Sequence, residues 1–291
     1  MQKIKSMLCC GKGAADVKEG ANAPAGKLGG VPTTHVPVAK AHPDWLDKPV
    51  KDFEVICSHN SYLHGLQIMA GASTDGLKLA LDKGARCIEL DVYAKHLHAE
   101  EWEPMVTHGS VMKGYHVKVT GSVSFDDCLK FIADNGWKDT DDPLFLMIEN
   151  VTDSAAETGN RMTEIVKKHI PEHRLMPHCS NIENTPLKDL LGKLIIVNGR
   201  DSGGSWSDFW TITAEGDMQN LNANEGPDAV DKNRICRIYP AADAGGFLSK
   251  NKDPTPFLGK TTFLAMNMQT DDDGLVTYLK HFGDCSFKLK A

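Results

Sequence analysis

The 291-residue sequence lacks any long apolar run. Its longest apolar segments, such as Leu144–Ile148 and Leu194–Val197, hold a few residues each, whereas a membrane-spanning helix needs about 20. The N-terminus also lacks the apolar stretch of about 7–15 residues that marks a secretory signal peptide. The eight cysteines are irregularly spaced without a C-x-x-C pair, which favours reduced thiols over a disulfide framework. We therefore expect a cytoplasmic protein.

An excess of positive charge is absent as well. The 32 Lys and Arg residues stand against 39 Asp and Glu residues, so no nucleic-acid partner is expected. Apolar residues make up 41% of the chain, enough for a sizeable core, which excludes a disordered or collagen-like protein. The length suits one large domain, such as an α/β barrel of about 250 residues with a tail.

The first 45 residues differ in composition from the rest. They are rich in Gly, Ala, Pro and Lys and show no apolar periodicity. Such a segment cannot bury enough apolar surface to offset its ordering entropy. We expect a disordered, flexible tail over residues 1–45 and one folded domain over residues 46–291.

Eight short runs typical of β-strands follow the tail. Several are apolar without strict alternation, as in strands that are buried on both faces. The runs are Phe53–Cys57, Cys87–Tyr93, Met105–Thr107, Leu144–Ile148, Leu194–Val197, Ile235–Tyr239, Phe263–Met268 and Ser286–Leu289.

Helical periodicity appears between some of these runs, over residues 77–84, 125–132 and 162–166. Helices that alternate with strands predict a parallel sheet, and eight strands predict an α/β fold of the (β/α)8 TIM-like barrel type. The link from Tyr93 to Met105 is too short for a crossover helix. We therefore expect a somewhat irregular barrel.

Polar side chains lie in or just after the first four strands, near their carboxyl ends, where barrel enzymes place their active sites. They are His59 and Asn60, Glu89 and Asp91, His108, and Glu149.

Glu89 and Asp91 are two residues apart, so on a strand they share one face. Two buried carboxylates repel each other unless a cation neutralises them, and Ca²⁺ prefers several oxygen ligands. Asn60 and Glu149 would complete an all-oxygen set with three negative charges. The two histidines remain for acid–base chemistry.

Sequence motifs around these residues occur in a characteristic order. S-H-N-S-Y-L (58–63), G-A-R-C-I-E-L-D-V (84–92), H-G (108–109), I-E-N (148–150) and P-L-K-D-L-L-G-K-L-I-I (186–196) occupy a first half, about residues 50–200. R-I-Y-P (237–240), A-M-N-M-Q-T (265–270) and G-D-C-S-F-K-L-K (283–290) occupy a second half, about residues 235–290. Together they resemble the catalytic halves of eukaryotic-type phosphoinositide-specific phospholipases C.

This resemblance implies an enzyme that cleaves phosphatidylinositol or phosphoinositides into diacylglycerol and inositol phosphate through a cyclic phosphodiester. It implies Ca²⁺ as cofactor and a phosphoinositide-containing membrane as partner. The implied calcium ligands are Asn60, Glu89, Asp91 and Glu149. Either Glu89 or Glu149 would be the general base.

The remaining roles are implied in the same way. His59 would stabilise charge on the phosphorus, and His108 would protonate the diacylglycerol oxygen as general acid. Arg237 and Tyr239 would hold the inositol phosphate headgroup. The resemblance implies no particular protein regulator.

The chain departs from the family at a site for ring phosphates. Members that prefer the bisphosphorylated lipid carry a K-x-K pattern after the fifth strand, where this sequence has Val197 and Gly199. Arg200 is a partial substitute. We expect a weaker preference for polyphosphorylated headgroups. About 35 residues separate the two halves, which argues against a long autoinhibitory linker.

Two segments suggest membrane contact, each with a plainer alternative. Trp206, Phe209 and Trp210 follow the fifth strand and either insert into the bilayer interface or pack as a loop or the start of a helix. Cys9 and Cys10 lie between lysines and are either S-palmitoylation sites of a peripheral membrane anchor or free thiols.

Two other functions stay open. A glycerophosphodiester phosphodiesterase also has an early His, an I-E-L-D-V motif and a later His, but its motifs normally read H-R-G and H-D. A catalytically inactive phosphoinositide-binding scaffold would be expected to lack a histidine or a calcium ligand. Both histidines and all four implied ligands are present here.

Overall fold

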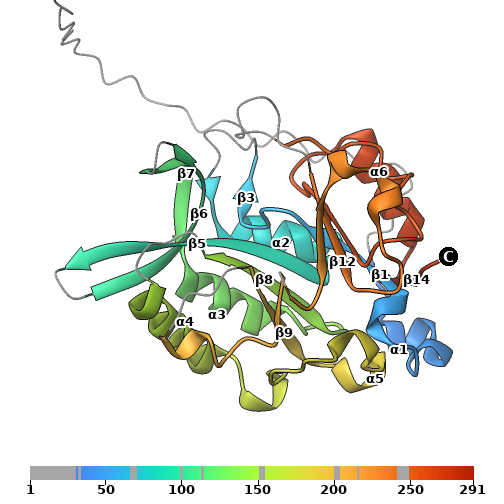
Figure 1. Cartoon of the computed structure of the whole chain (residues 1–291), viewed down its shortest axis with the longest axis horizontal. Coiled ribbons are helices and arrows are strands. Elements are labelled where there is room, and N and C mark those ends of the chain that lie inside the picture. Colours follow the sequence, from blue (N-terminus) through green and yellow to red (C-terminus); the bar gives the residue numbers. More distant parts are fainter. Residues whose placement is uncertain are drawn as a thin grey trace, which may run out of the picture.

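The computed structural model describes residues 31, 34–65, 71–98, 101–112, 115–150, 155–199, 204–214, 216–240 and 249–291. Its α-helices flank a curled, mainly parallel sheet (Figure 1). These helices are α1 (Val38–Ala41), α2 (Thr74–Asp82), α3 (Phe125–Asn135), α4 (Ala155–His169), α5 (Leu187–Leu190) and α6 (Asp273–Phe282).

Eight parallel strands follow one another around the sheet in sequence order, as the barrel prediction requires. They are β2 (Cys57–Ser58), β5 (Cys87–His98), β8 (Leu144–Asn150), β9 (Leu194–Asn198), β10 (Ile212–Thr213), β11 (Gln219–Asn222), β12 (Cys236–Tyr239) and β13 (Phe263–Met266). Strand β13 pairs back to β2. Among the described residues β10 and β11 do not pair, so this TIM-like barrel has one open seam.

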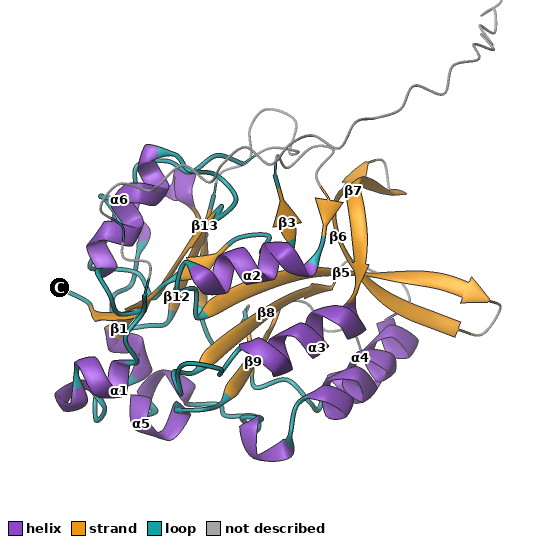
Figure 2. Cartoon of the chain, turned by 180° about the vertical axis from the view of Figure 1, so that it is seen from behind, coloured by secondary structure: helices purple, strands orange, loops and turns teal. Residues whose placement is uncertain are grey.

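The other strands lie outside the barrel ring. Strand β1 (Phe53–Val55) pairs antiparallel with β14 (Phe287–Leu289), and β3 (Leu63–His64) pairs with β4 (Gly71–Ala72). Strands β6 (Glu101–Met112) and β7 (Tyr115–Ser124) continue antiparallel from β5. The outer parts of β5 and β6 project from the barrel as an arm (Figure 2).

Two of the eight predicted strands were therefore wrong as barrel strands. Met105–Thr107 lies in β6, which turns back on β5 because the short link allows only a hairpin. Ser286–Leu289 corresponds to β14, which pairs antiparallel with β1. The barrel positions belong instead to β10 and β11, which are short and, in β11, largely polar.

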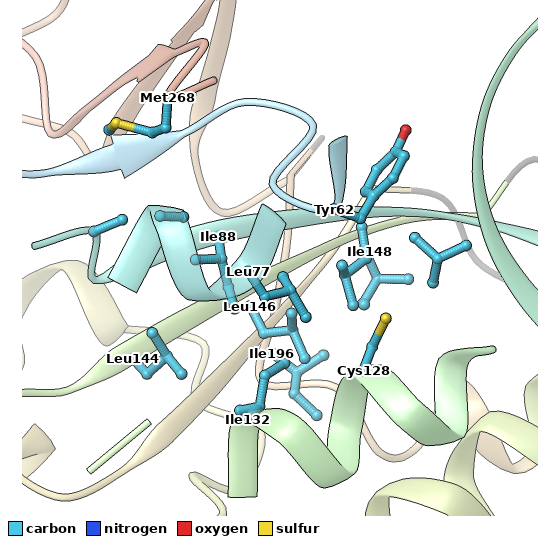
Figure 3. Close-up of a cluster of buried hydrophobic side chains, with 14 of the residues drawn as sticks. Tyr62, Leu77, Ile88, Cys128, Ile132, Leu144, Leu146, Ile148, Ile196 and Met268 are labelled. Carbon is cyan, nitrogen blue, oxygen red and sulfur yellow. The ribbon is translucent and has the colours of Figure 1, made fainter. Parts of the chain in front are cut away.

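Alternation along β5 separates two layers. Ile88, Leu90 and Val92 pack in the cluster that the barrel shares with the helices, whereas Cys87 joins the cluster inside the barrel. Figure 3 shows the outer layer, in which Leu77 of α2 and Cys128 and Ile132 of α3 lie against strand residues such as Ile88, Leu146 and Ile196. Glu89 and Asp91 therefore share the inward face with Cys87, as predicted.

The barrel interior is apolar below the site. The rings of Phe145 and Phe263 meet edge to face with centroids 4.9 Å apart, and Met147 and Val197 are buried in the same cluster. The charged residues of β5 and β8 lie further toward the carboxyl ends of their strands. Apolar packing thus fills the interior and leaves the carboxyl end for polar chemistry.

Helix ends follow the expected capping chemistry. The hydroxyl of Ser73 accepts a hydrogen bond from the Asp75 backbone N–H at the start of α2. The hydroxyl of Ser124 accepts one from the Asp127 backbone N–H at the start of α3. Asp272 caps α6 by accepting from the Leu275 amide. The periodic segments predicted as helices correspond to α2, α3 and part of α4.

The end of the predicted tail is part of the packed structure. The Val36 amide donates to the Asp284 carbonyl at 2.6 Å, and the Val38 amide donates to a carboxylate oxygen of Asp142 at 2.8 Å. Val38 is fully buried. The folded unit therefore begins before residue 46. Residues 1–30, including Cys9 and Cys10, lie outside the described residues.

Within the part of the chain that the structure describes, no helix is both long enough and apolar enough to cross a bilayer.

Candidate active site

The turn after β2 connects two strands through its backbone. Asn60 has a φ of 45°, in the left-handed region that asparagine tolerates better than most residues. The backbone N–H of Asn60 donates to Glu89 Oε2 at 2.9 Å, while the backbone N–H of Glu89 donates to Ser61 Oγ at 2.9 Å. This reciprocal pair fixes Asn60 beside the carboxylate of Glu89.

Three carboxylates meet at this end of the barrel. Asp91 of β5 lies in register with Glu149 of β8, and Glu89 precedes Asp91 on the same face. One oxygen from each of the three carboxylates lies within 4.8 Å of the others. The structure thus brings together the acidic residues that the sequence singled out.

Tyr62 supports this cluster from within the core. Its hydroxyl donates to Asp91 Oδ2 at 2.7 Å and lies 3.4 Å from Asn60 Oδ1. Burial, followed by the nearby Asp91 carboxylate, raises the pKa of Tyr62 well above its ordinary value. Tyr62 therefore remains a neutral donor that orients two of the expected ligands. Sequence reasoning missed this role, although Tyr62 lies in the S-H-N-S-Y-L motif.

Arg237 of β12 lies between two of the carboxylates. Its Nη2 donates to Glu89 Oε1, and its Nη1 donates to Glu149 Oε1 at 3.1 Å. The Arg237 side chain is only 3% exposed. Sequence reasoning placed this residue against the headgroup, whereas in the structure its guanidinium is paired with the acidic cluster.

Burial and charge act in opposite directions on these carboxyl groups. Burial raises the pKa of Glu89, but Arg237, His59 and the backbone N–H of Asn60 together outweigh this effect and the net pKa is lowered. Burial, followed by repulsion from Glu89, raises the pKa of Glu149 to about 7. The Glu149 side chain is nevertheless 46% exposed, so water screens part of that repulsion.

His59 is held by a buried amide. Its Nδ1 donates to Asn267 Oδ1 at 2.9 Å, and its Nε2 lies 3.9 Å from Glu89 Oε2. Asn267 is fully buried and also donates to the Ser249 carbonyl at 3.1 Å. Nε2 is therefore the nitrogen of His59 that can exchange a proton in the site. Asn267 lies in the A-M-N-M-Q-T motif, but sequence reasoning gave it no role.

His108 of β6 approaches the cluster from the other side. Its Nδ1 accepts from Asn60 Nδ2 at 3.3 Å and lies 3.7 Å from Asp91 Oδ2. In this arrangement a neutral His108 carries its proton on Nε2. That nitrogen is the one that can protonate a leaving group.

The donor set fits a hard divalent cation. The carboxylates of Glu89, Asp91 and Glu149, with the amide oxygen of Asn60, supply the oxygen ligands that Ca²⁺ prefers. Arg237 balances one of the three negative charges. The remaining two match the charge of one such cation.

The other predicted headgroup contacts lie at the rim or outside the described residues. Tyr239 ends β12 and, with Lys250 and Met266, lines a small recess. The guanidinium carbon of Arg237 lies 5.7 Å from the centre of the Tyr239 ring. Arg200 is not among the described residues.

The aromatic segment after β9 packs against the protein and includes a short 3-10 helix, Gly204–Trp206. Trp206 is fully buried, and its indole nitrogen donates to Asn198 Oδ1 at 3.0 Å. Phe209 and Trp210 are partly buried against the outer core. Insertion of Trp206 into a bilayer was therefore a wrong interpretation, because its ring is enclosed by the protein.

The sequence was compared with known families and proteins. Residues 46–200 match the model of the phosphatidylinositol-specific phospholipase C X domain. A 1-phosphatidylinositol 4,5-bisphosphate phosphodiesterase of Drosophila melanogaster is 30% identical over 164 residues, 53% of this chain and 14% of that protein. The delta-3-A enzyme of Danio rerio is 25% identical over 206 residues, 67% of this chain and 24% of that protein. The chain thus spans less than a quarter of the length of these relatives.

Solved structures share the fold. PLC21 of S. officinalis superposes with a TM-score of 0.70 at 21% identity, covering 84% of this chain and 37% of that one. A calcium-dependent phosphoinositol-specific phospholipase C from Pseudomonas sp superposes with a TM-score of 0.53 at 12% identity, covering 85% of this chain and 97% of that one.

Proposed function

The chain belongs to the phosphatidylinositol-specific phospholipase C family, and we propose that it cleaves the phosphodiester between diacylglycerol and the inositol phosphate of membrane phosphoinositides. The observation that carries this proposal is the cluster of Glu89, Asp91 and Glu149 with a histidine on either side. The names of the curated relatives support the same bond as the target.

We assign the calcium site to Asn60, Glu89, Asp91 and Glu149. Bound there, Ca²⁺ would polarise the phosphoryl group and lower the pKa of the inositol 2-hydroxyl. Tyr62 and the Asn60 turn keep the ligand oxygens in place through the hydrogen bonds described above.

Glu149 is the better candidate for the general base. Both oxygens of Glu89 already accept hydrogen bonds, one from Arg237 and the other from the backbone N–H of Asn60, which leaves lone pairs for a cation but makes Glu89 less able to take a proton. Glu149 is 46% exposed and is therefore accessible to a substrate hydroxyl. Proton removal by Glu149 would let the 2-hydroxyl attack the phosphorus and form a cyclic phosphodiester.

The two histidines would act on opposite sides of the phosphorus. His59, anchored by Asn267 through Nδ1, would in its protonated form donate from Nε2 to an equatorial oxygen and stabilise the developing charge. His108, whose Nδ1 is held by Asn60, would donate its Nε2 proton to the diacylglycerol oxygen. Water would then open the cyclic product with the acid and base roles reversed.

The headgroup would lie between β12 and the cluster. Tyr239 offers a ring for packing against inositol. Arg237 and Arg200 remain the proposed contacts to headgroup oxygens. The substrate places the enzyme at a membrane surface, so we propose peripheral association. Acylation of Cys9 and Cys10 remains a prediction.

The proposal is tested by diacylglycerol release from phosphatidylinositol and its bisphosphate in mixed micelles, with Ca²⁺ or with EGTA. We expect release only with Ca²⁺, and a loss of about 10²–10⁴-fold in kcat for His108→Ala. His178→Ala, which removes an exposed histidine, is the matched control. A folded protein that binds Ca²⁺ but releases nothing would favour the scaffold, and hydrolysis of glycerophosphoinositol would favour the glycerophosphodiester phosphodiesterase.

A further inference from the structure

The environment of Arg237 is unusual for a residue expected to bind a substrate. Its two terminal nitrogens pair with different carboxylates, Glu89 and Glu149, and its Nε has no hydrogen-bond partner among the described residues. The side chain is 97% buried, since only 3% is exposed. Arg237 therefore acts as an internal cation within the acidic cluster.

Charge explains why such a cation is needed. Three carboxylates gathered within a few ångströms repel one another, and a buried charge without a partner is strongly destabilising. The guanidinium offsets this repulsion and ties β12 to β5 and β8. The cluster can then persist before any metal ion binds.

The same contacts compete with a bound divalent cation. Glu149 Oε1 faces Arg237 Nη1 at 3.1 Å, so this oxygen cannot turn fully to a metal ion while the pair is intact. Glu89 is enclosed and held on both oxygens. Glu149 is half exposed and is therefore the carboxylate that can exchange partners.

We propose that Arg237 is an exchangeable counter-cation that couples divalent-cation binding to binding of the anionic headgroup. The cation takes Glu149 from Arg237, and the released Nη1 then binds an oxygen of the headgroup. This proposal rests on the proposed function. Because coupling is reciprocal, each ligand strengthens the binding of the other.

The test measures calcium affinity by calorimetry, with and without soluble myo-inositol 1-phosphate. In the wild-type protein we expect the headgroup to tighten calcium binding by roughly fivefold or more. In Arg237→Met, calcium binding without headgroup becomes tighter, because the competitor is gone, and the tightening caused by the headgroup becomes smaller. A purely structural Arg237 predicts the opposite sign, because the carboxylates would separate and bind calcium more weakly.

A second variant covers the case in which Arg237→Met does not fold. Arg237→Lys keeps the charge but cannot bridge two carboxylates, so it should also bind calcium more tightly than the wild type. Arg86→Met is the matched control, because Arg86 is a buried arginine whose guanidinium donates only to backbone carbonyls. It should lower Tm without changing calcium affinity or coupling.

The outcomes separate the two proposals. Tighter calcium binding with reduced coupling in the Arg237 variants supports the exchange. Weaker binding, or unchanged coupling, overturns it even if the wild-type enzyme hydrolyses its lipid. Absence of calcium binding and turnover in the wild-type protein overturns the proposed function itself.

Discussion

Single side chains outside the proposed ligand set determine how the site residues point. Tyr62 orients Asp91, and Asn267 holds His59 through its Nδ1. Outer hydrogen bonds of this kind commonly set metal affinity or activity as strongly as a direct ligand. Removing one of these hydrogen bonds should therefore change calcium affinity or activity more than it changes the stability of the fold.

Removing the Tyr62 hydroxyl tests whether its hydrogen bond to Asp91 supports calcium binding. In Tyr62→Phe we expect calcium affinity to fall by about 10-fold, because Asp91 loses the donor that orients it. Tyr278→Phe is a matched control, since it removes a fully buried hydroxyl that accepts from the Cys57 backbone N–H and donates to the Val55 carbonyl rather than to a carboxylate of the cluster. Calorimetry should show unchanged affinity there, and equal losses in both variants would contradict the role of Tyr62.

The buried imidazole of His35 should make the stability of the fold sensitive to acid. Its ring covers Gly84, where an added Cβ would lie 2.2 Å from the imidazole. Burial, partly opposed by Asp284, lowers the pKa of His35 below its ordinary value. As pH falls, the unfolded chain therefore binds this proton first, and the stability that neutral His35 contributes above about pH 6.5 is lost.

His35→Phe removes that titration but keeps a flat ring over Gly84. We expect the free energy of unfolding, measured in urea, to decrease as the pH is lowered from 7.5 to 5.5, and to decrease more for the wild-type protein than for the variant. His173→Phe, at an exposed position, is the control and should follow the wild type. A His35→Phe variant as acid-sensitive as the wild type would contradict the assignment.

The sequence could predict which acidic residues meet but not what holds them. Glu89 and Asp91 share a face by strand periodicity, so their clustering near β8 was predictable. Arg237 lies 148 residues from Glu89, and no local pattern predicts an ion pair at that separation. The same limit applies to Asn267 and His59, which are 208 residues apart.

Among the elements, helix α2 lies closely against the turn that carries the site. A Cβ at Gly76 would be 2.6 Å from the Tyr62 carbonyl carbon and 2.8 Å from the Leu63 oxygen. Only glycine permits this approach. The helix thereby supports the backbone on which Asn60 and Tyr62 are placed.

Gly76→Ala should change stability through two opposing effects, helix propensity and packing against the turn. Helix propensity alone would make alanine more stable by about 1 kcal/mol. Overpacking against the turn costs about 1–3 kcal/mol, so we expect a net loss of stability and of calcium affinity. Thermal unfolding should show a lower Tm, whereas Gly71→Ala, which has open space around it, should not. A rise in Tm for Gly76→Ala would contradict the close contact.

Strand β9 carries the position at which headgroup preference was predicted to differ. Val197 is buried inside the barrel in register with Met147, two residues before Glu149 on the neighbouring strand. A lysine there would extend toward the cluster. The Cβ of a residue at Gly199 would lie 3.0 Å from the Ile148 carbonyl, so that position tolerates a side chain less well.

We expect Val197→Lys to raise turnover of the bisphosphate relative to phosphatidylinositol by about 10-fold, the effect of one charge-assisted hydrogen bond of roughly 1.5 kcal/mol. Val197→Met is the neutral control of similar length. Mixed-micelle assays on both lipids give the ratio. An unchanged ratio in a folded Val197→Lys protein would contradict the link between this position and headgroup preference.

Strong patterns predicted the helices α2 and α3, while several strands escaped, among them the long strand β7. The helices α2 and α3 combine an N-cap serine with a complete apolar stripe. Strand β10 has two residues and β11 reads Q-N-L-N, so neither shows a β pattern, and their pairing comes from the barrel around them. Met105–Thr107 does show a β pattern, but β6 pairs antiparallel outside the ring.

For the whole molecule, the barrel order explains why distant residues meet. Strands β2, β5 and β8 are neighbours, and β13 closes back on β2. This arrangement brings His59, the acidic cluster and Asn267 to one end of the barrel although they span most of the chain. The fold class was predictable from the helix–strand alternation, but the open seam between β10 and β11 was not.

The bond that is cleaved tests the central claim most directly. Phosphorus NMR of the water-soluble products from phosphatidylinositol, with Ca²⁺ and with EGTA, identifies that bond. We predict a cyclic inositol phosphate that forms with diacylglycerol only in the presence of Ca²⁺. Formation of a glycerol phosphate, or equal product formation in EGTA, would contradict a calcium-dependent phospholipase C.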